Sequence, residues 1–449
     1  MAQKNKATVT VGFVALGCPK NIVDSEKMLA DIAQGGFLIS SEPADSDVVI
    51  INTCGFIAPA KAEALDVIRS AVGWKRTRAV KKVIVAGCLS ERLGKRLFEE
   101  ADGIDAIVGL GQRNDICSVI RQTLSSQDTS AFLGHSREMI SDDRIRLLIG
   151  PAHRAYLRIS EGCDWKCSFC TIPAIRGRFR SKPLEMVLAE ASELADAGVV
   201  ELNVIGQDTT GWGSDLKIRD GLAVLLRELE RVKSIEWIRL LYLYPARITD
   251  RLIETIAVSE KVVHYLDIPL QHIDNEILKK MCRPDTKDAI CRLIEKIRRA
   301  LPDVVLRTSL IVGFPSESDE QFEELLEFVN WAGFDALGCF QYYAEEGTEA
   351  AGLKQQIPEK VKQERFKELM IYQQKTAFEK NKRRIGSELV CLVDTVDGKS
   401  GGIGRYFGQA PDIDGVCIIK GYRGRAGVFI NVKVIGTKDY DLIVKQIKP

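Results

Sequence analysis

Three cysteines on one short segment are the feature of this 449-residue sequence that most directly indicates chemistry. Cys163, Cys167 and Cys170 stand in the run EGCDWKCSFC, directly after the apolar run YLRIS. A structural zinc site needs four ligands, and the closest histidine, His153, precedes that apolar run. Three cysteines on a cubane of four irons instead leave one iron open to an exogenous ligand. The spacing therefore favours an open iron–sulfur cluster, and a zinc loop completed by a distant residue is the alternative.

A second set of cysteines is dispersed in sequence but repeats one structural position. Cys18, Cys54 and Cys88 are 36 and 34 residues apart, and each directly follows a predicted strand. In an open parallel sheet the carboxyl ends of the strands form the ligand crevice. An isolated buried cysteine is usually an inert packing residue, but three at equivalent positions favour a second three-cysteine cluster. Six cysteines lack such grouping and are predicted to be packing residues: Cys117, Cys282, Cys291, Cys339, Cys391 and Cys417.

The elements that must position these cysteines form an α/β multidomain chain. Alternating strand-like and helix-like runs predict an N-terminal parallel α/β sheet domain over residues 8–125, and the polar stretch 126–150 is predicted to be a linker. Six further strand–helix units over residues 151–374 predict a partial (β/α)6 barrel, because a complete eight-unit barrel typically needs about 250 residues.

The C-terminal part has a different pattern. Residues 357–385 are predicted to form one charged helix, with Gly386 as its stop. After it, short alternating runs separated by glycine-rich turns predict a small all-β barrel, so that residues 375–449 hold the helix end and this barrel. From Lys375 onward there are fourteen Lys and Arg against eight Asp and Glu, a balance of +6. That charge would suit contact with a nucleic-acid-rich particle or with an acidic protein surface. The alternative is that the basic residues form a solvated face without a partner.

The composition is that of a globular protein. Lys and Arg number 63 against 62 Asp and Glu, and hydrophobic residues make up 45% of the chain, which excludes a disordered or fibrous protein. No apolar run approaches the roughly 18 residues needed to cross a bilayer, and the N-terminal residues lack an apolar signal stretch. We therefore expect a cytoplasmic protein without a membrane partner.

The cysteine triplet, with Phe169 just before its third member, resembles that of the radical S-adenosylmethionine (SAM) enzymes. In that superfamily the open iron of a 4Fe-4S cluster binds SAM, and reduction cleaves SAM to give a 5′-deoxyadenosyl radical. Together with the second cysteine set and the terminal β domain, which is similar to a TRAM domain, the chain resembles the methylthiotransferase family over residues 8–449.

Within that family the sequence resembles the RimO branch, which modifies a ribosomal protein. The runs that carry this resemblance are ALGCPKNIVDSE from Ala15 to Glu26, the stretch from Ser160 to Ser181, and IGQDTTGWG from Ile205 to Gly213. The branch usually has alanine where this chain has Gly206.

The resemblance implies a specific reaction and set of cofactors. It implies SAM and two 4Fe-4S clusters, one on Cys18, Cys54 and Cys88 and the other on Cys163, Cys167 and Cys170. The substrate implied is an aspartate of the small-subunit ribosomal protein numbered twelve, near the decoding centre, which gains sulfur and a methyl group at its β-carbon. A flavodoxin- or ferredoxin-type electron donor and RNA contact through the TRAM domain are implied as well. No residue beyond the cluster ligands is predicted to be catalytic.

Residues at other strand ends are candidates for contact with SAM. The predicted contacts are Phe169, Gly206, Gln207, Asp208, Gln271 and Gly313, and for the polar and glycine positions an ordinary turn is the alternative. His272 is predicted to be a packing residue. Arg176 and Arg180 would attract an acidic target loop or a phosphate, or else form a solvated basic turn.

Two other function classes remain open at this point. A methylthiotransferase acting on adenosine in transfer RNA would keep both clusters, but that branch usually has a Gln-Met-Asn type sequence after the first cysteine. A noncatalytic iron–sulfur carrier or RNA-binding protein would not cleave SAM on reduction.

Overall fold

The computed structural model describes residues 8–77, 79–134, 142–398 and 401–447. Residues 135–141 of the predicted linker lie outside the described residues. The chain forms two compact units. The first unit comprises residues 1–149, 161–164 and 171–179, and the second unit comprises residues 150–160, 165–170 and 180–449.

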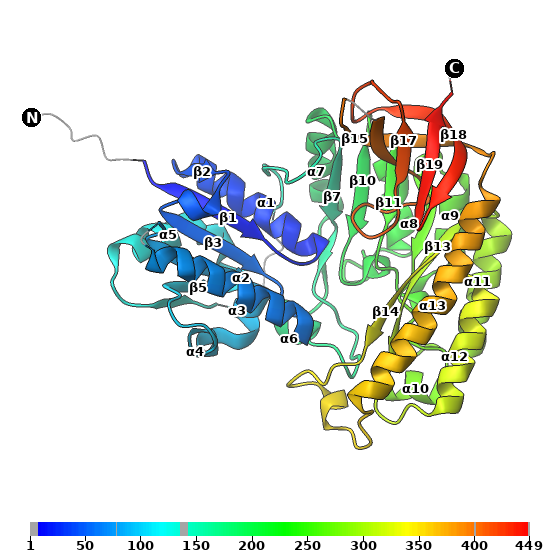
Figure 1. The fold of residues 1–449 in the computed structure, drawn as a ribbon, viewed down its shortest axis with the longest axis horizontal. Coiled ribbons are helices and arrows are strands. Elements are labelled where there is room, and N and C mark those ends of the chain that lie inside the picture. The colour runs from blue at the N-terminus through cyan, green and yellow to red at the C-terminus, as the bar shows by residue number, and fades with distance from the viewer. Residues whose placement is uncertain (1–7, 78, 135–141, 399–400, 448–449) are drawn as a thin grey trace, which may run out of the picture. The chain divides into compact units, whose positions relative to one another are not determined.

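The first unit is built on a six-stranded parallel sheet (Figure 1). Its strands, in the spatial order β2-β1-β3-β4-β5-β6, are β1 (Thr10–Ala15), β2 (Leu38–Ser40), β3 (Val48–Thr53), β4 (Lys82–Gly87), β5 (Ala106–Val108) and β6 (Ser130–Phe132). Its helices are α1 (Pro19–Gln34), α2 (Ala58–Arg76), α3 (Cys88–Leu93), α4 (Leu97–Glu100), α5 (Ile116–Ser125) and α6 (Ile172–Arg176). The predicted parallel α/β sheet is confirmed.

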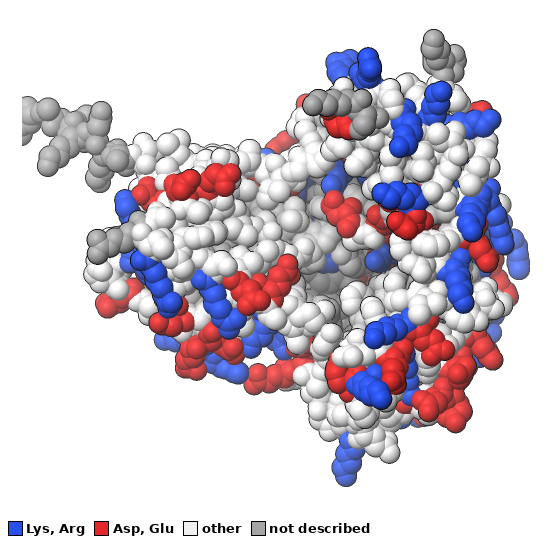
Figure 2. Space-filling model, viewed as in Figure 1, with Lys and Arg blue, Asp and Glu red and all other residues white. Residues whose placement is uncertain are grey.

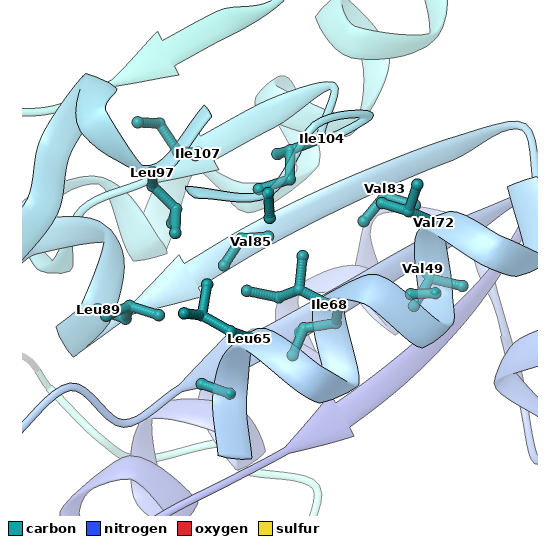
Figure 3. Packing of buried hydrophobic residues seen from close by; sticks show 14 of the residues in the cluster. Val49, Leu65, Ile68, Val72, Val83, Val85, Leu89, Leu97, Ile104 and Ile107 are labelled. Atoms are coloured by element: carbon teal, nitrogen blue, oxygen red, sulfur yellow. The ribbon is translucent and has the colours of Figure 1, made fainter. Parts of the chain in front are cut away.

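Both faces of this sheet are buried, which explains the nearly continuous apolar strands in the sequence. Val83 and Val85 of β4 pack with Leu65 and Ile68 of α2 on one face (Figure 3). Ile84, between them in sequence, points to the other face, where it joins a second buried cluster. Successive side chains of a strand point to opposite faces, so one short strand serves two cores.

Strand β6 is an addition to the sequence prediction, because it lies within the predicted linker. Its three residues, Ser-Ala-Phe, are too few to show a period of two. Farther along, Arg146 of the linker is buried against Glu26 of α1, with 3.1 Å between Nη1 and Oε2. This part of the linker is therefore fixed to the first unit by a buried ion pair.

The second unit contains a six-stranded parallel sheet in sequential order, as the partial barrel requires. Its strands are β7 (Arg154–Arg158), β10 (Glu201–Ile205), β11 (Trp237–Leu240), β12 (Val262–Asp267), β13 (Val305–Val312) and β14 (Ala336–Gln341). Its helices are α7 (Leu184–Asp196), α8 (Gly221–Glu230), α9 (Asp250–Val258), α10 (Asn275–Lys280), α11 (Lys287–Ala300), α12 (Asp319–Ala332) and α13 (Glu359–Arg383). The two-residue strands β8 (Ser160–Glu161) and β9 (Arg180–Ser181) precede and follow the cysteine loop in the chain.

A closed five-stranded barrel follows α13, as predicted. Its strands are β15 (Glu388–Val396), β16 (Gly401–Tyr406), β17 (Cys417–Lys420), β18 (Phe429–Lys438) and β19 (Asp441–Gln446), drawn in orange to red in Figure 1. Gly386, at the turn from α13 into the barrel, has φ of 92°, a conformation that glycine adopts without strain.

Buried ion pairs join this barrel to the amino-terminal ends of the parallel strands within the second unit. Glu201, the first residue of β10, is wholly buried and lies 2.7 Å from Nη2 of Arg405 and 3.0 Å from Nε of Arg239. Arg405 also bonds Asp394 at 2.7 Å, and Asp414 accepts a 2.7 Å hydrogen bond from Tyr265. The barrel is thus packed at the amino-terminal ends of the parallel strands. The SAM contacts were predicted at the opposite, carboxyl ends.

On the face drawn in Figure 2, acidic and basic side chains are interspersed over both units. No helix among the described residues is long and apolar enough to cross a membrane. Of the six ungrouped cysteines, Cys339, Cys391 and Cys417 are buried as packing residues should be, whereas Cys282 is exposed, so the packing prediction is wrong there. Cys282 lies in the turn after α10, where one side of the chain faces solvent.

Candidate metal centres

The cysteine loop of residues 163–170 follows the first strand of the second unit's sheet and is fixed by backbone hydrogen bonds. The amide of Cys170 donates to the carbonyl of Cys167 at 3.1 Å, and the amide of Ser168 donates to the carbonyl of Met281 at 3.1 Å. Gly162, just before the first cysteine, has φ of 76°, and a Cβ there would lie 2.1 Å from the carbonyl oxygen of Arg178. Only glycine fits this entry to the loop.

Trp165, in the middle of the cysteine loop, contacts an aromatic ring and an arginine of the second unit. Its ring stacks on Tyr244 with 3.9 Å between centroids and an interplanar angle of 5°. Arg247 lies over the Trp165 ring at 4.9 Å, and Arg283 lies over the Tyr244 ring at 4.2 Å. An aromatic pair contributes about 0.5–1.5 kcal/mol beyond burial, and each cation–π contact about 0.5–1 kcal/mol.

Asp208 lies at the carboxyl end of β10 and is almost completely buried, with 1% of its surface exposed. Its carboxylate accepts hydrogen bonds from Trp165 Nε1 at 2.8 Å, from Arg247 Nη1 at 2.9 Å, and from Thr210 and Gly211. These contacts tie the cysteine loop to the strand end. The carboxylate of Asp208 is thus bonded to four protein groups, and its contact with SAM stays a prediction.

Gly206 and Gly313 are each required by a close approach. A Cβ on Gly206 would lie 2.4 Å from Oγ of Ser160, which leaves no room for the alanine that the branch usually has at position 206. Gly313, at the end of β13, has φ of 71°, and a Cβ there would lie 2.3 Å from Cγ of Lys362. These glycines bring backbone close to side chains of the second unit, and their contact with SAM remains a prediction.

Gln271 and His272 follow β12. Gln271 has a strained φ of 73°, and its amide donates to the carbonyl of Ser309 at 2.9 Å, which directs this backbone along β13. His272 is wholly buried, and its Nδ1 accepts the amide hydrogen of Asp274 at 3.0 Å. Its Nε2 is buried without a hydrogen-bond partner among the described residues and lies 3.7 Å from Oε2 of Glu317, so the packing role of His272 stays a prediction. Phe169 is partly buried against an apolar cluster, and its contact with SAM stays a prediction; that cluster is Ile277, Met281, Ile311, Phe314, Tyr342 and Ala350.

The surroundings of Cys167 suit a bound group at the cysteine loop. The hydroxyl of Tyr244 is buried and makes a side-chain hydrogen bond with Cys167. Burial raises the pKa of the Cys167 thiol, and the nearby Arg283 guanidinium opposes that rise. A buried cation and a hydroxyl that both contact one thiol are suited to an anionic thiolate cluster. No three His, Cys, Asp or Glu side chains within the described ranges converge on a single-ion site.

The second cysteine set lies at one edge of the first unit's sheet. Cys18 directly precedes α1, Cys54 follows β3, and Cys88 is the first residue of α3 after β4. Strands β1, β3 and β4 are neighbours in the sheet, so their carboxyl ends meet at the same edge. Gly17 is packed so closely that its Cβ would lie 2.6 Å from Cβ of Cys54.

These three thiols also affect one another electrostatically. Burial raises the pKa of Cys88 to about 12, and the charges of Cys18 and Cys54 add to the rise, while Arg176 opposes it. Such a thiol stays protonated unless a metal replaces the proton. The donor set of three thiols at one sheet edge therefore fits an iron–sulfur cluster.

Arg176, at the end of α6, differs from both sequence interpretations, because its side chain is buried with 1% exposed. Its guanidinium bonds Asp24 at 3.0 Å and Glu161 at 3.0 Å, and it donates to Sγ of Cys88 at 3.3 Å. It is neither a solvated basic turn nor free to attract an acidic loop. Arg180 is half-buried. The sequence offered no signal for Tyr244, Arg247 or Arg283, which lie far from the cysteines in the chain.

The chain matches three family models. The Radical SAM superfamily model matches residues 157–329, the Uncharacterized protein family UPF0004 model matches residues 10–109, and the TRAM domain model matches residues 385–447. Among solved structures, the radical SAM methyltransferase TsrM from Kitasatospora setae has a TM-score of 0.54 at 16% identity, covering 74% of this chain and 75% of that chain. That likeness concerns the fold. The parallel sheet and the cysteine loop after its first strand define a radical SAM enzyme.

Curated relatives identify the family within that class. The chain is 42% identical to the ribosomal protein uS12 methylthiotransferase RimO of Geobacter sulfurreducens, over 98% of this chain and 99% of the relative. It is also 42% identical to the protein of the same name from Desulforamulus reducens, over 97% of this chain and 98% of the relative. The chain belongs to the RimO family and is a radical SAM methylthiotransferase.

Proposed function

We propose that this chain adds sulfur and a methyl group to the β-carbon of an aspartate in ribosomal protein uS12. The observation that carries the proposal is the position of Cys18, Cys54 and Cys88 at the carboxyl ends of three neighbouring strands. A cluster held by three cysteines leaves one iron open, and sulfur for insertion would be held there. The name shared by the curated relatives supports uS12 as the substrate.

Each cysteine set has one cluster to hold in this proposal. Cys163, Cys167 and Cys170 hold the 4Fe-4S cluster of the radical SAM superfamily, and Cys18, Cys54 and Cys88 hold a second one. When bound, the first cluster and SAM supply the radical that removes a hydrogen from an unactivated carbon, which no ordinary base could do. Cys18, Cys54 and Cys88 would hold the second cluster, which would supply the sulfur.

The remaining strand-end residues shape the SAM site. Gln207 and Gln271 supply polar groups, and the backbone at Gly206 and Gly313 approaches the cofactor because neither residue has a side chain. Phe169 packs on the apolar residues beneath the loop and excludes water from the iron–sulfur cluster.

The partners follow from the substrate. An assembled small ribosomal subunit is rich in RNA, and the surplus of basic residues from Lys375 onward suits contact with it. A flavodoxin- or ferredoxin-type protein supplies the electron. Ribosomes place the reaction in the cytoplasm.

The test is an anaerobic reaction of the reconstituted, reduced enzyme with SAM, offered unmodified small ribosomal subunits and transfer RNA side by side. Mass spectrometry reads both products. Addition of a methylthio group to one uS12 aspartate is the expected result, and addition only to transfer-RNA adenosine would overturn the substrate assignment. The Cys291→Ala variant, in which a half-buried cysteine outside both sets is changed, is the matched control and keeps full activity.

A further inference from the structure

Four side chains of the second unit form a continuous stack that begins at the cysteine loop. Trp165 and Tyr244 face each other at 3.9 Å, so their inner faces are occupied. Arg247 over Trp165 and Arg283 over Tyr244 therefore lie on the outer faces. The order of the layers is Arg247, Trp165, Tyr244 and Arg283. We call these four residues the arginine–aromatic stack.

Both ends of the stack are fixed by further contacts. Arg247 and the indole nitrogen of Trp165 both donate to the same carboxylate, that of Asp208, at 2.9 and 2.8 Å. At the other end, Arg283 donates to the carbonyl of Pro269 at 3.1 Å and lies 3.4 Å from Asp285. The stack is thereby tied to the segments that follow β10 and β12.

Arg283 is the layer next to Cys167. Its side chain is 3% exposed, and it makes a side-chain hydrogen bond with Cys167. Ser168 is bonded to the segment just before Arg283 through the carbonyls of Lys280 and Met281. A buried cation is thus held next to the middle cysteine of the triplet.

We propose that the arginine–aromatic stack is a positioning device that holds the guanidinium of Arg283 at Cys167 and so makes the radical SAM cluster easier to reduce. Reduction adds one negative charge to a cluster, and a fixed cation nearby stabilises that charge more strongly in a dry site than in water. The proposal rests on the assignment of Cys163, Cys167 and Cys170 as the cluster ligands. Arg283 is a positioning residue here, since it acts through a ligand of the cluster.

Asp285 allows a second test, in which the reduction potential should shift in the opposite direction. Its carboxylate, 4% exposed, pairs with Arg283 and weakens the positive charge that reaches Cys167. Removing the charge of Arg283 should therefore make reduction harder, and removing the charge of Asp285 should make it easier. A merely structural role for the two residues would not predict opposite signs.

The experiment is a redox titration followed by electron paramagnetic resonance on the full chain. Alanine in place of Cys18, Cys54 and Cys88 leaves only the radical SAM cluster to be read. At the midpoint potential of this parent, we expect R283M to lower the ratio of reduced to oxidised cluster about tenfold, which is about 59 mV for one electron. D285N should raise this ratio. R283K keeps the positive charge and should therefore have a ratio close to that of the parent.

Trp165 is tested in the same background. W165F keeps an aromatic ring over Tyr244 but loses the hydrogen bond to Asp208, and W165A removes the stack, so W165A should shift the potential in the direction of R283M and further than W165F does. R231M removes an exposed arginine of the α8 end and is the matched control without a shift.

The outcomes separate this inference from the cluster assignment. Unchanged midpoint potentials in R283M and D285N, with full iron content, would overturn the role of the stack. If R283M retains no cluster, D285N and R283K still decide the question by the sign and size of their shifts. Full iron retention in C163A of the same background would instead overturn the cluster assignment in the proposed function.

Discussion

The buried carboxylate of Glu201 offers the sharpest test of how the second unit is held together. It is wholly buried and bonds two arginines: Arg405, which is 204 residues away and belongs to the C-terminal barrel, and Arg239 of β11. Glu201→Gln leaves both guanidiniums without their shared countercharge. Removing one partner of a buried ion pair destabilises a protein by about 3–5 kcal/mol.

The expected loss lies at the lower end of that range, about 3 kcal/mol, because each arginine keeps another partner. Arg405 retains Asp394 at 2.7 Å, and Arg239 retains the carbonyl of Phe407 and the ring of Tyr265. An unfolding entropy of about 2.1 cal/mol/K per residue gives a shift of about 1.7 °C in Tm per kcal/mol for a unit of this size, so Glu201→Gln should lower the apparent Tm by about 5 °C.

The pH dependence of this effect has a definite sign. Burial raises the pKa of Glu201, but the guanidiniums of Arg405 and Arg239 outweigh it and hold the pKa below its ordinary value. A lowered folded-state pKa gives stability that is present above the unfolded-state pKa and is lost as the pH falls through the folded-state pKa. The difference in Tm between the parent chain and Glu201→Gln should therefore be full near neutral pH and shrink only in acid.

Differential scanning calorimetry of the full chain measures this difference. Glu388→Gln makes the same chemical change at an exposed position of β15 and should alter the stability by no more than about 0.5 kcal/mol. A decrease in Tm for Glu201→Gln that is no larger than that of Glu388→Gln would refute the reasoning. So would a difference that grows as the pH falls.

Three further predictions concern the cysteine sets. Cys54→Ala should keep reductive cleavage of SAM but stop sulfur insertion, and the iron content should fall from about eight to about four atoms per chain. Gly162→Ala should lose the radical SAM cluster, because its Cβ would overlap the carbonyl oxygen of Arg178, 2.1 Å away; iron analysis and SAM cleavage measure this loss. Arg176→Met should lose the second cluster and keep the first, because the guanidinium that bonds Sγ of Cys88 is removed; electron paramagnetic resonance counts the remaining clusters.

Matched variants and contrary outcomes are available for each of these predictions. Cys291→Ala should keep full iron content, and normal sulfur insertion by Cys54→Ala would contradict the second cluster. Gly73→Ala, where a Cβ meets nothing within 4 Å, controls for the glycine change, and equal iron content in Gly162→Ala would show that the loop can shift. Arg231→Met is the control for Arg176→Met. Two intact clusters in Arg176→Met would contradict the predicted loss of the second cluster.

The cysteine sets could be predicted because they depend on local pattern. Cys18, Cys54 and Cys88 each follow a strand directly, and parallel strands bring their carboxyl ends to one edge whatever their spatial order. The same reasoning located the radical SAM loop after a strand and the closed barrel after Gly386. Local periodicity therefore determined the fold class and the candidate cluster ligands.

Contacts between distant segments could not be predicted in the same way. Trp165 contacts Asp208, Tyr244 and Arg247, and Tyr244 in turn contacts Arg283. These four partners follow three different strands. Strand β6 was missed because three residues carry no measurable period.

Charge illustrates the same division between sequence and tertiary structure. The sequence of this chain determined its strands, its cysteine sets and its family resemblance, because each depends on residues close together in the chain. Only the tertiary structure decided that Arg176 is buried against Cys88 and that Arg405 neutralises Glu201. Whether a charged side chain is solvated or buried depends on which strand ends and loops the packed sheets bring together, and no local pattern carries that information.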